Sequence, residues 1–194
     1  ELDESVQAFK DALCSKKKYY GTSHLQLASV YQLLGVCLVD KQEIGAARES
    51  FEKALGLWGD SADDYERRAD QLTCKGFLAK ICDENEIALK CFDDALQILQ
   101  SNAPRCRVKM SHLLHFLGRI YFERGQERSA MTFFEASNLE GSKILGVDHV
   151  DFASNFCYMA AIHQRAGRNA SAMNFLKEAL RIRELHMPDS ALVS

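Results

Sequence analysis

The segment GAARESFEKAL, residues 45–55, carries a pattern that recurs along the whole chain. Its small residue Ala47 is followed four positions later by the large apolar Phe51, and three positions further by the small Ala54. Spacings of four and three place the three side chains on one face of an α-helix. The same small, large, small order returns in four other segments, SVQAFKDAL (5–13), IALKCFDDAL (87–96), SAMTFFEAS (129–137) and SAMNFLKEAL (171–180).

The recurrence has a nearly constant period. The last small residues of the five segments are 42, 41, 42 and 42 positions apart, and they are Ala12, Ala54, Ala95, Ser137 and Ala179. Another small residue stands twelve positions before the leading one of each later segment, and these four are Gly35, Gly76, Gly118 and Ala160. The residues between form short polar stretches, VDKQE, CDENE, ERGQE and RAGRN. The repeat unit is therefore predicted to be a first helix (helix A), a tight turn of constant length and a second helix (helix B).

The residue types indicate how the two helices pack. Small side chains on helix A and helix B allow close approach, and the Phe or Leu of helix B is expected to fill the hole between neighbouring helices. One hairpin cannot bury its apolar faces alone, so consecutive hairpins are expected to stack.

This pattern of small, aromatic and small residues resembles the tetratricopeptide repeat (TPR), although the usual TPR period is about 34 residues. The additional residues fall between helix B and the next helix A. Within the TPR group, the 42-residue period is similar to that of kinesin-light-chain-like proteins, and three motifs carry this resemblance. They are Ala179-Leu-Arg-Ile-Arg-Glu184, Leu145-Gly-Val-Asp-His-Val-Asp-Phe-Ala153 and Gly21-Thr-Ser-His-Leu-Gln-Leu-Ala28.

The chain departs from that subgroup at two kinds of position. Leu25 and Val150 stand where the subgroup has a proline after the histidine. The paired asparagines that line its cargo groove are replaced by Gln32/Leu33, Thr73/Cys74, His115/Phe116 and Cys157/Tyr158. The resemblance implies an architecture and a binding role, but it does not carry over the cargo specificity.

The fold implied by the resemblance is all-α, a right-handed TPR superhelix of about nine antiparallel helices. We expect a single array over residues 1–194, with a lone helix B at 1–18 whose missing helix A implies that the natural protein, or at least the array, extends upstream. The chain begins with Glu and not Met, so we interpret it as a fragment or a processed chain. Four hairpins are expected to follow it, at 24–58, 62–100, 105–145 and 149–187. The interval before the charged helix at 62–82 is one residue short, which predicts a local irregularity there.

The composition is that of a globular protein, because 47% of the 194 residues are hydrophobic and 26% are charged. A net charge of −3 gives no indication of nucleic-acid binding, and no apolar run of about 18 residues indicates a membrane span. Seven scattered cysteines without a CxxC motif favour a reducing compartment, so we expect a cytoplasmic location.

The resemblance places a partner-binding groove on the inner, concave face, which is formed mainly by helix A. The side chains there are not required by the hairpin core and are candidates for recognition. These candidates are Gln32, Val36, Asp40, Asp70, Thr73, Phe77, Lys80, His112, His115, Arg119, Phe122, Glu123, Cys157, Gln164 and Arg165. The set from His112 to Glu123 suits the carboxylates or aromatic groups of an extended peptide or helix, while a plain solvated wall is the alternative.

Catalytic, metal and cofactor sites are not expected. His112 and His115 supply too few ligands for zinc, and the cationic Arg119 lies one turn away. Cys74 and Cys157 lie near the predicted groove, but no base and orienting partner for a nucleophile can be identified.

The remaining notable side chains have structural interpretations. His163 is interpreted as a core or boundary residue and Trp58 as a packing residue. His24 and His149 are expected to organise the loops that lead from helix B to helix A. Three cysteines are interpreted as inert core residues, and they are Cys37, Cys82 and Cys91.

We therefore predict a non-catalytic adaptor or scaffold that binds a protein or peptide partner in its concave groove. The alternative is a structural module that packs against the rest of a longer chain or forms a homodimer through its ends.

Overall fold

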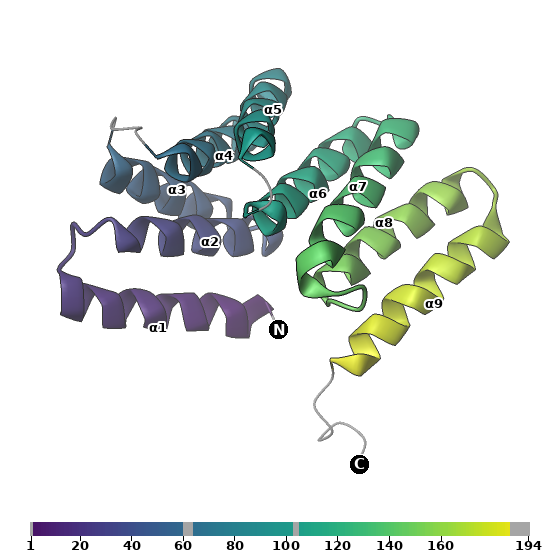
Figure 1. The fold of residues 1–194 in the computed structure, drawn as a ribbon, viewed down its shortest axis with the longest axis horizontal. Coiled ribbons are helices and arrows are strands. Elements are labelled where there is room, and N and C mark those ends of the chain that lie inside the picture. The colour runs from purple at the N-terminus through teal and green to yellow at the C-terminus, as the bar shows by residue number, and fades with distance from the viewer. Residues whose placement is uncertain (1, 60–63, 103–104, 187–194) are drawn as a thin grey trace, which may run out of the picture. The chain divides into compact units, whose positions relative to one another are not determined.

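The computed structural model describes residues 2–59, 64–102 and 105–186, and in these ranges the chain forms nine α-helices (Figure 1). The helices are α1 (Leu2–Tyr20), α2 (Gln26–Asp40), α3 (Ile44–Trp58), α4 (Tyr65–Ile81), α5 (Asn85–Ser101), α6 (Arg107–Glu123), α7 (Glu127–Leu145), α8 (Asp151–Arg165) and α9 (Asn169–Leu185). The all-α fold class is confirmed. None of the described helices is both long and apolar enough to cross a membrane.

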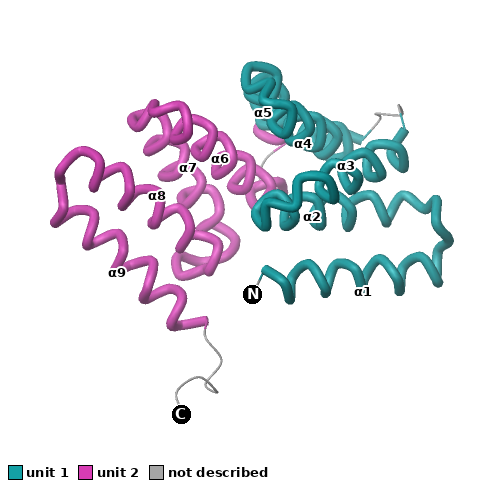
Figure 2. Tube along the Cα trace, turned by 180° about the vertical axis from the view of Figure 1, so that it is seen from behind, with its two compact units in different colours: residues 1–98 teal, residues 99–194 magenta. Residues whose placement is uncertain are grey.

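The chain divides into two compact units, residues 1–98 and 99–194 (Figure 2). In the first unit, α2 packs against α1, α3 and α4; in the second, α6 pairs with α7, α8 with α9, and α8 also contacts α6 and α7. A single continuous array over both units stays a prediction. The irregularity expected before the helix at 62–82 falls partly outside the described residues, because residues 60–63 are not among them; α4 begins after Asp64, whose side chain accepts a hydrogen bond from Glu66 N.

Each of three hairpins is closed by contact between a helix-A glycine and a helix-B phenylalanine. A Cβ atom at Gly35, Gly76 or Gly118 would lie 2.6–2.7 Å from the ring of Phe51, Phe92 or Phe134, respectively. These three rings are fully buried, with exposed fractions of 0–1%. Only glycine allows the two helices to approach this closely without displacing the ring.

The expectation that Leu176 fills the same hole in the last hairpin is wrong. Leu176 is 46% exposed, although its position in the repeat is that of the three buried phenylalanines. Phe175 packs inward instead, with its ring 6.2 Å from that of Phe156 and 5.2 Å from that of His163. In the other hairpins the ring of helix B also stacks on the following helix, Phe51 on Phe77 and Phe134 on Tyr158. Leu176 has no such neighbour in the described residues, because α9 is the last helix described.

The turns between helix A and helix B are built alike in all four hairpins, as the constant interval predicts. In each, the third-from-last residue of helix A accepts a hydrogen bond from a backbone N–H five positions on, as from Gln126 N to Tyr121 O at 2.9 Å. The residue before this donor has a positive φ, and the four residues concerned are Gln42, Asp83, Gly125 and Gly167. This is the left-handed helix end that glycine favours.

Several sequence interpretations can now be compared with the structure. Trp58 is 6% exposed, which confirms its packing role. His24 and His149 act as predicted, because their Nδ1 atoms accept hydrogen bonds from Gln26 N and Asp151 N at 3.2 and 3.4 Å. Cys82 is a correction: it follows the last turn of α4 and is exposed, not a core residue.

The glycine–phenylalanine contact predicts that Gly35→Ala destabilises the first unit by up to about 2 kcal/mol. Overpacking costs about 1–3 kcal/mol, and the higher helix propensity of alanine offsets about 1 kcal/mol of it. The ring of Phe51 cannot retreat easily, because Phe77 stacks on it at 5.0 Å. Urea unfolding followed by the fluorescence of Trp58, the chain's single tryptophan, measures the change.

Gly56→Ala is the matched control, because Gly56 lies in α3 and a Cβ there would meet no atom within 4 Å. We expect this control to be neutral or stabilising by up to about 1 kcal/mol. Equal effects of the two substitutions would contradict the close-contact explanation.

Candidate partner-binding surface

The predicted groove residues are divided between the two units. Gln32, Val36 and Asp40 lie on α2, and Asp70, Thr73, Phe77 and Lys80 on α4, all in the first unit. The other eight residues lie on α6 and α8 in the second unit.

Two of the first-unit residues are corrections. Phe77 is 5% exposed and belongs to the core, with its ring 5.0 Å from that of Phe51 and 5.3 Å from that of Phe92. Thr73 is 8% exposed, and its hydroxyl donates to Ala69 O at 2.8 Å. Neither side chain can line a groove in this structure.

The other first-unit candidates are half-buried, apart from the exposed Asp40. Among them, Lys80 Nζ donates to Asn85 Oδ1 at 3.1 Å. Cys74 beside them is fully buried, and burial, with a smaller effect of Asp70, raises the pKa of its thiol. A buried, protonated thiol is not a nucleophile, so Cys74 does not belong to a reactive site.

In the second unit, arginine side chains of α6 and α8 lie over aromatic rings of α6. The guanidinium of Arg165 lies 4.1 Å from the ring centroid of Phe122, and that of Arg119 lies 6.0 Å from the centroid of Phe116. Phe122 in turn meets Tyr158 edge-on at 5.4 Å. The candidates of this unit, which we call the α6/α8 wall, are His112, His115, Arg119, Phe122, Glu123, Cys157, Gln164 and Arg165.

The wall residues differ in how far they reach solvent. His112, Glu123, Gln164 and Arg165 are exposed, whereas the other four are half-buried. Cys157 packs partly against a buried cluster that includes Ala179 and Ile182 of α9. The exposed Arg165 and the half-buried Arg119 therefore make the wall a cationic surface.

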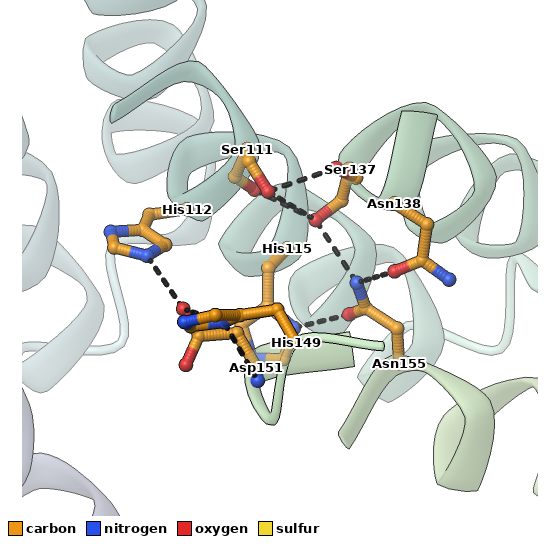
Figure 3. Close-up of polar contacts among 8 residues, drawn as sticks. All are labelled: Ser111, His112, His115, Ser137, Asn138, His149, Asp151 and Asn155. Carbon is orange, nitrogen blue, oxygen red and sulfur yellow. Dashed lines mark hydrogen bonds and ion pairs between the residues drawn. The ribbon is translucent and has the colours of Figure 1, made fainter. Parts of the chain in front are cut away.

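A buried polar network contacts the ring of His115 (Figure 3). Its Nδ1 lies 2.6 Å from Oδ1 of Asn155, a residue of α8 that is 1% exposed. The amide nitrogen of Asn155 donates to Ser137 Oγ at 3.0 Å and to Asn138 Oδ1 at 2.6 Å. The network thus ties α6, α7 and α8 together beneath the wall.

The base of the network is a reciprocal pair of serines. Ser111 Oγ donates to Ser137 O, and Ser137 Oγ donates to Ser111 O, both at 2.8 Å. The equivalent pairs in the other hairpins are alanines, Ala28/Ala54, Ala69/Ala95 and Ala153/Ala179. Among the described hairpins, only α6–α7 has a hydrogen-bonded pair in place of the two alanines.

These bonds determine the tautomer of His115. Because Ser137 Oγ gives its proton to Ser111 O, it can only accept from Asn155, which turns the amide nitrogen of Asn155 toward it. The amide oxygen of Asn155 then faces His115, so Nδ1 of His115 carries the proton. The ring orientation is fixed by the fold and not by a ligand.

A second polar group lies at the start of α8 (Figure 3). Asp151 Oδ2 is 3.3 Å from His112 Nε2 and 3.4 Å from His149 Nδ1. The hydrogen bond from His112 is the main reason that the pKa of Asp151 is lowered, although burial of the carboxyl group opposes this effect. This pair is about half exposed, so its energetic contribution is small.

Two other features limit the chemistry of the surface. Within residues 2–59, 64–102 and 105–186, no group of three or more His, Cys, Asp or Glu side chains is placed to hold a metal ion. His163 is half-buried, as a boundary residue should be, and its Nδ1 is a buried atom without a hydrogen-bond partner.

Sequence reasoning missed the residues that support the wall. Asn155, Asn138 and Ser111 were not identified, although Ser137 stood out as the one serine at the final small position of the pattern. Comparing sister positions would have found Asn155, which replaces Val30 and Leu113 of two other helices.

The network predicts that Asn155→Ala destabilises the second unit by about 1–3 kcal/mol, the cost of leaving buried polar groups without partners. His115 Nδ1 and Ser137 Oγ each lose a partner in this variant. Thermal and urea unfolding followed by circular dichroism measure the loss.

Asn174→Ala, an exposed asparagine in α9, is the matched control and should change stability by less than about 0.5 kcal/mol. An Asn155→Ala variant as stable as this control would show that the network contributes nothing.

The comparisons with known proteins agree with this architecture. Two family models described as tetratricopeptide repeat match residues 28–57 and 157–189. A curated relative, Protein KINESIN LIGHT CHAIN-RELATED 3 of Arabidopsis thaliana, is 24% identical over 96% of this chain and 28% of its own length. The chain therefore spans less than a third of that relative.

Solved structures show the same fold at low sequence identity. A Podosopora anserina kinesin light chain with nearly identical TPR-like repeats superposes with a TM-score of 0.52 at 17% identity, covering 96% of this chain and 90% of that one. MamA gives 0.52 at 18% identity, with coverages of 94% and 89%. BtubC (BKLC) from P. vanneervenii gives 0.51 at 13%, with coverages of 97% and 94%. The chain thus has the all-α TPR solenoid fold, with two segments that match the tetratricopeptide repeat, and it is similar to kinesin-light-chain-like proteins.

Proposed function

We propose that this chain is a non-catalytic interaction scaffold whose α6/α8 wall binds an extended peptide or helix carrying carboxylate and aromatic side chains. The observation that carries the proposal is the Arg165 guanidinium lying 4.1 Å over Phe122, with Arg119 over Phe116 on the same helix. A guanidinium stacked on a ring keeps its N–H groups directed outward for a carboxylate.

The wall combines two kinds of recognition. The exposed Arg165 offers charge-assisted hydrogen bonds to acidic side chains, and the half-buried Phe122 and Tyr158 offer aromatic contacts. Glu123 ends α6 one helical turn after Arg119, so an acidic ligand group is expected to bind away from it. This asymmetry would give the bound segment a direction.

The buried network supports the proposal energetically. A surface whose side chains are already held in place loses less conformational entropy when a ligand binds. His115 is fixed by Asn155 at 2.6 Å and by ring contacts with Tyr158 and Phe116. All seven cysteines are free thiols, which fits a function in a reducing compartment such as the cytoplasm.

Selection from a random 16-residue peptide display library against the chain tests the proposal. We expect the selected peptides to be enriched in Asp or Glu together with Trp, Tyr or Phe. In fluorescence anisotropy, Arg165→Ala should weaken the best peptide about tenfold or more, because a charge-assisted hydrogen bond contributes roughly 1.5–3 kcal/mol.

Arg128→Ala, on an exposed position of α7 outside the wall, is the control and should bind as the wild type does. Unchanged affinity in both Arg165→Ala and Phe122→Ala, with helicity intact, would remove the α6/α8 wall as the binding surface.

A further inference from the structure

Side chains of α6 and α8 contact each other in a row that runs along the α6/α8 wall, and Figure 3 shows the first part of this row. Both helices contribute to the row in the order of their sequences. The contacting pairs are His112 with Asp151, His115 with Asn155, Phe122 with Tyr158, and Phe122 with Arg165. Asp151 and Arg165 are therefore the two ends of the row on α8.

The two ends carry opposite charges. Asp151 is the first residue of α8 and its side chain is 44% exposed, whereas Arg165 is the last residue and is exposed. The 15 residues of α8 separate these ends by about 21 Å, because an α-helix rises about 1.5 Å per residue. Tyr158 lies midway, at a spacing close to two helical turns from each end, so the three side chains share one face.

The carboxylate of Asp151 retains an unoccupied oxygen. Its Oδ2 accepts a hydrogen bond from His112 Nε2 and lies near His149 Nδ1, whereas no side chain within the described ranges contacts its Oδ1 (Figure 3). The hydrogen bond from His112 lowers the pKa of Asp151, so the group is ionised at neutral pH. An ionised carboxylate with an unoccupied oxygen can accept a charge-assisted hydrogen bond from a basic ligand group.

The chain itself does not supply that basic group. In the part of the chain that the structure describes, Asp151 forms ion pairs with histidines and not with lysine or arginine. Asp148, the other acidic residue beside the start of α8, is already paired with Arg181. The charge of Asp151 is therefore available to a ligand, whereas that of Asp148 is compensated.

We infer that Asp151 selects a basic residue in the peptide that the α6/α8 wall binds. The ligand is then an extended segment with Lys or Arg at Asp151, an acidic residue at Arg165 and an aromatic residue between them. This inference rests on the proposed function, in which Arg165 binds the acidic residue. Asp151 thus sets the orientation of the segment, which the cationic end alone does not.

The length of the row specifies the spacing in the ligand. An extended chain rises about 3.3 Å per residue, so about six positions separate the basic residue from the acidic one. Residues i, i+2, i+4 and i+6 of an extended chain point to one side, so the aromatic residue is expected at i+2 or i+4. A helix is about 10 Å across, and the direct contacts between α6 and α8 leave no groove of that width between them.

Selection from a random 16-residue peptide display library against the 194-residue chain and its variants tests the inference. For the wild type we expect Lys or Arg five to seven positions from Asp or Glu, with an aromatic residue between them. Asp151→Asn should abolish the enrichment of Lys and Arg and keep that of Asp and Glu, and Arg165→Ala should do the reverse. The matched control Glu135→Gln, which removes an exposed carboxylate of α7 outside the wall, should select the same peptides as the wild type.

A double-mutant cycle with the best selected peptide measures the contact itself. Replacing the basic residue of the peptide by methionine should weaken its binding to the wild-type chain about threefold in fluorescence anisotropy, as expected for a partly exposed ion pair. The same replacement should leave binding to Asp151→Asn unchanged, and the threefold loss should shrink as salt increases. Asn at this position can still accept the hydrogen bond from His112, so circular dichroism should show wild-type helicity.

The outcomes separate this inference from the proposed function. The inference alone is overturned by peptides rich in acidic and aromatic residues but not in Lys or Arg, or by Lys and Arg enrichment that Asp151→Asn leaves unchanged. A basic residue about fourteen positions from the acidic one, the spacing of a helix, would also overturn it. Acidic enrichment that survives in Arg165→Ala would remove the proposed function and the inferred spacing with it. A library that yields no binding peptide would overturn both.

Discussion

The close approach of a helix-A glycine to a helix-B phenylalanine is the contact on which the repeat depends. At Gly35, Gly76 and Gly118 the facing ring lies only 2.6–2.7 Å from where a Cβ atom would be, and the ring itself is fully buried. The contact sets the distance between the two helices of a hairpin, and the left-handed turn residues set where helix B begins. Because the ring also stacks on the next helix in α3 and α7, one side chain links two successive hairpins.

The other side chains of helix A are not constrained by this contact and can differ between repeats. The α6–α7 hairpin differs most clearly. Its alanine pair has become Ser111 and Ser137, and the hydroxyl groups are satisfied by each other's backbone and by Asn155. A fully satisfied buried network holds neighbouring helices in one arrangement, because any shift would leave polar groups without partners. The aromatic and cationic side chains of the α6/α8 wall are displayed on this fixed support.

The repeat period, the helix–turn–helix unit and the glycine–phenylalanine positions could be predicted from the sequence, because they recur four or five times. Side chains that occur once could not. Phe77 was assigned to a groove by its repeat position, but a large ring beside Phe51 gains more by stacking in the core. Leu176 matched the buried position and is exposed, because burial there depends on a following helix. Asn155 was not identified from the sequence, because its role depends on Ser137 and His115, which only the fold brings beside it.

A double-mutant cycle on Gly118 and Phe134 tests the central contact most directly. Gly118→Ala is predicted to be destabilising in the wild-type background and nearly neutral with Phe134→Leu, because removing the ring frees the space that the added Cβ atom needs. The expected coupling energy, from urea unfolding followed by circular dichroism, is at least about 1 kcal/mol. Additive effects of the two substitutions would contradict the account, because the ring and the glycine would then not constrain each other.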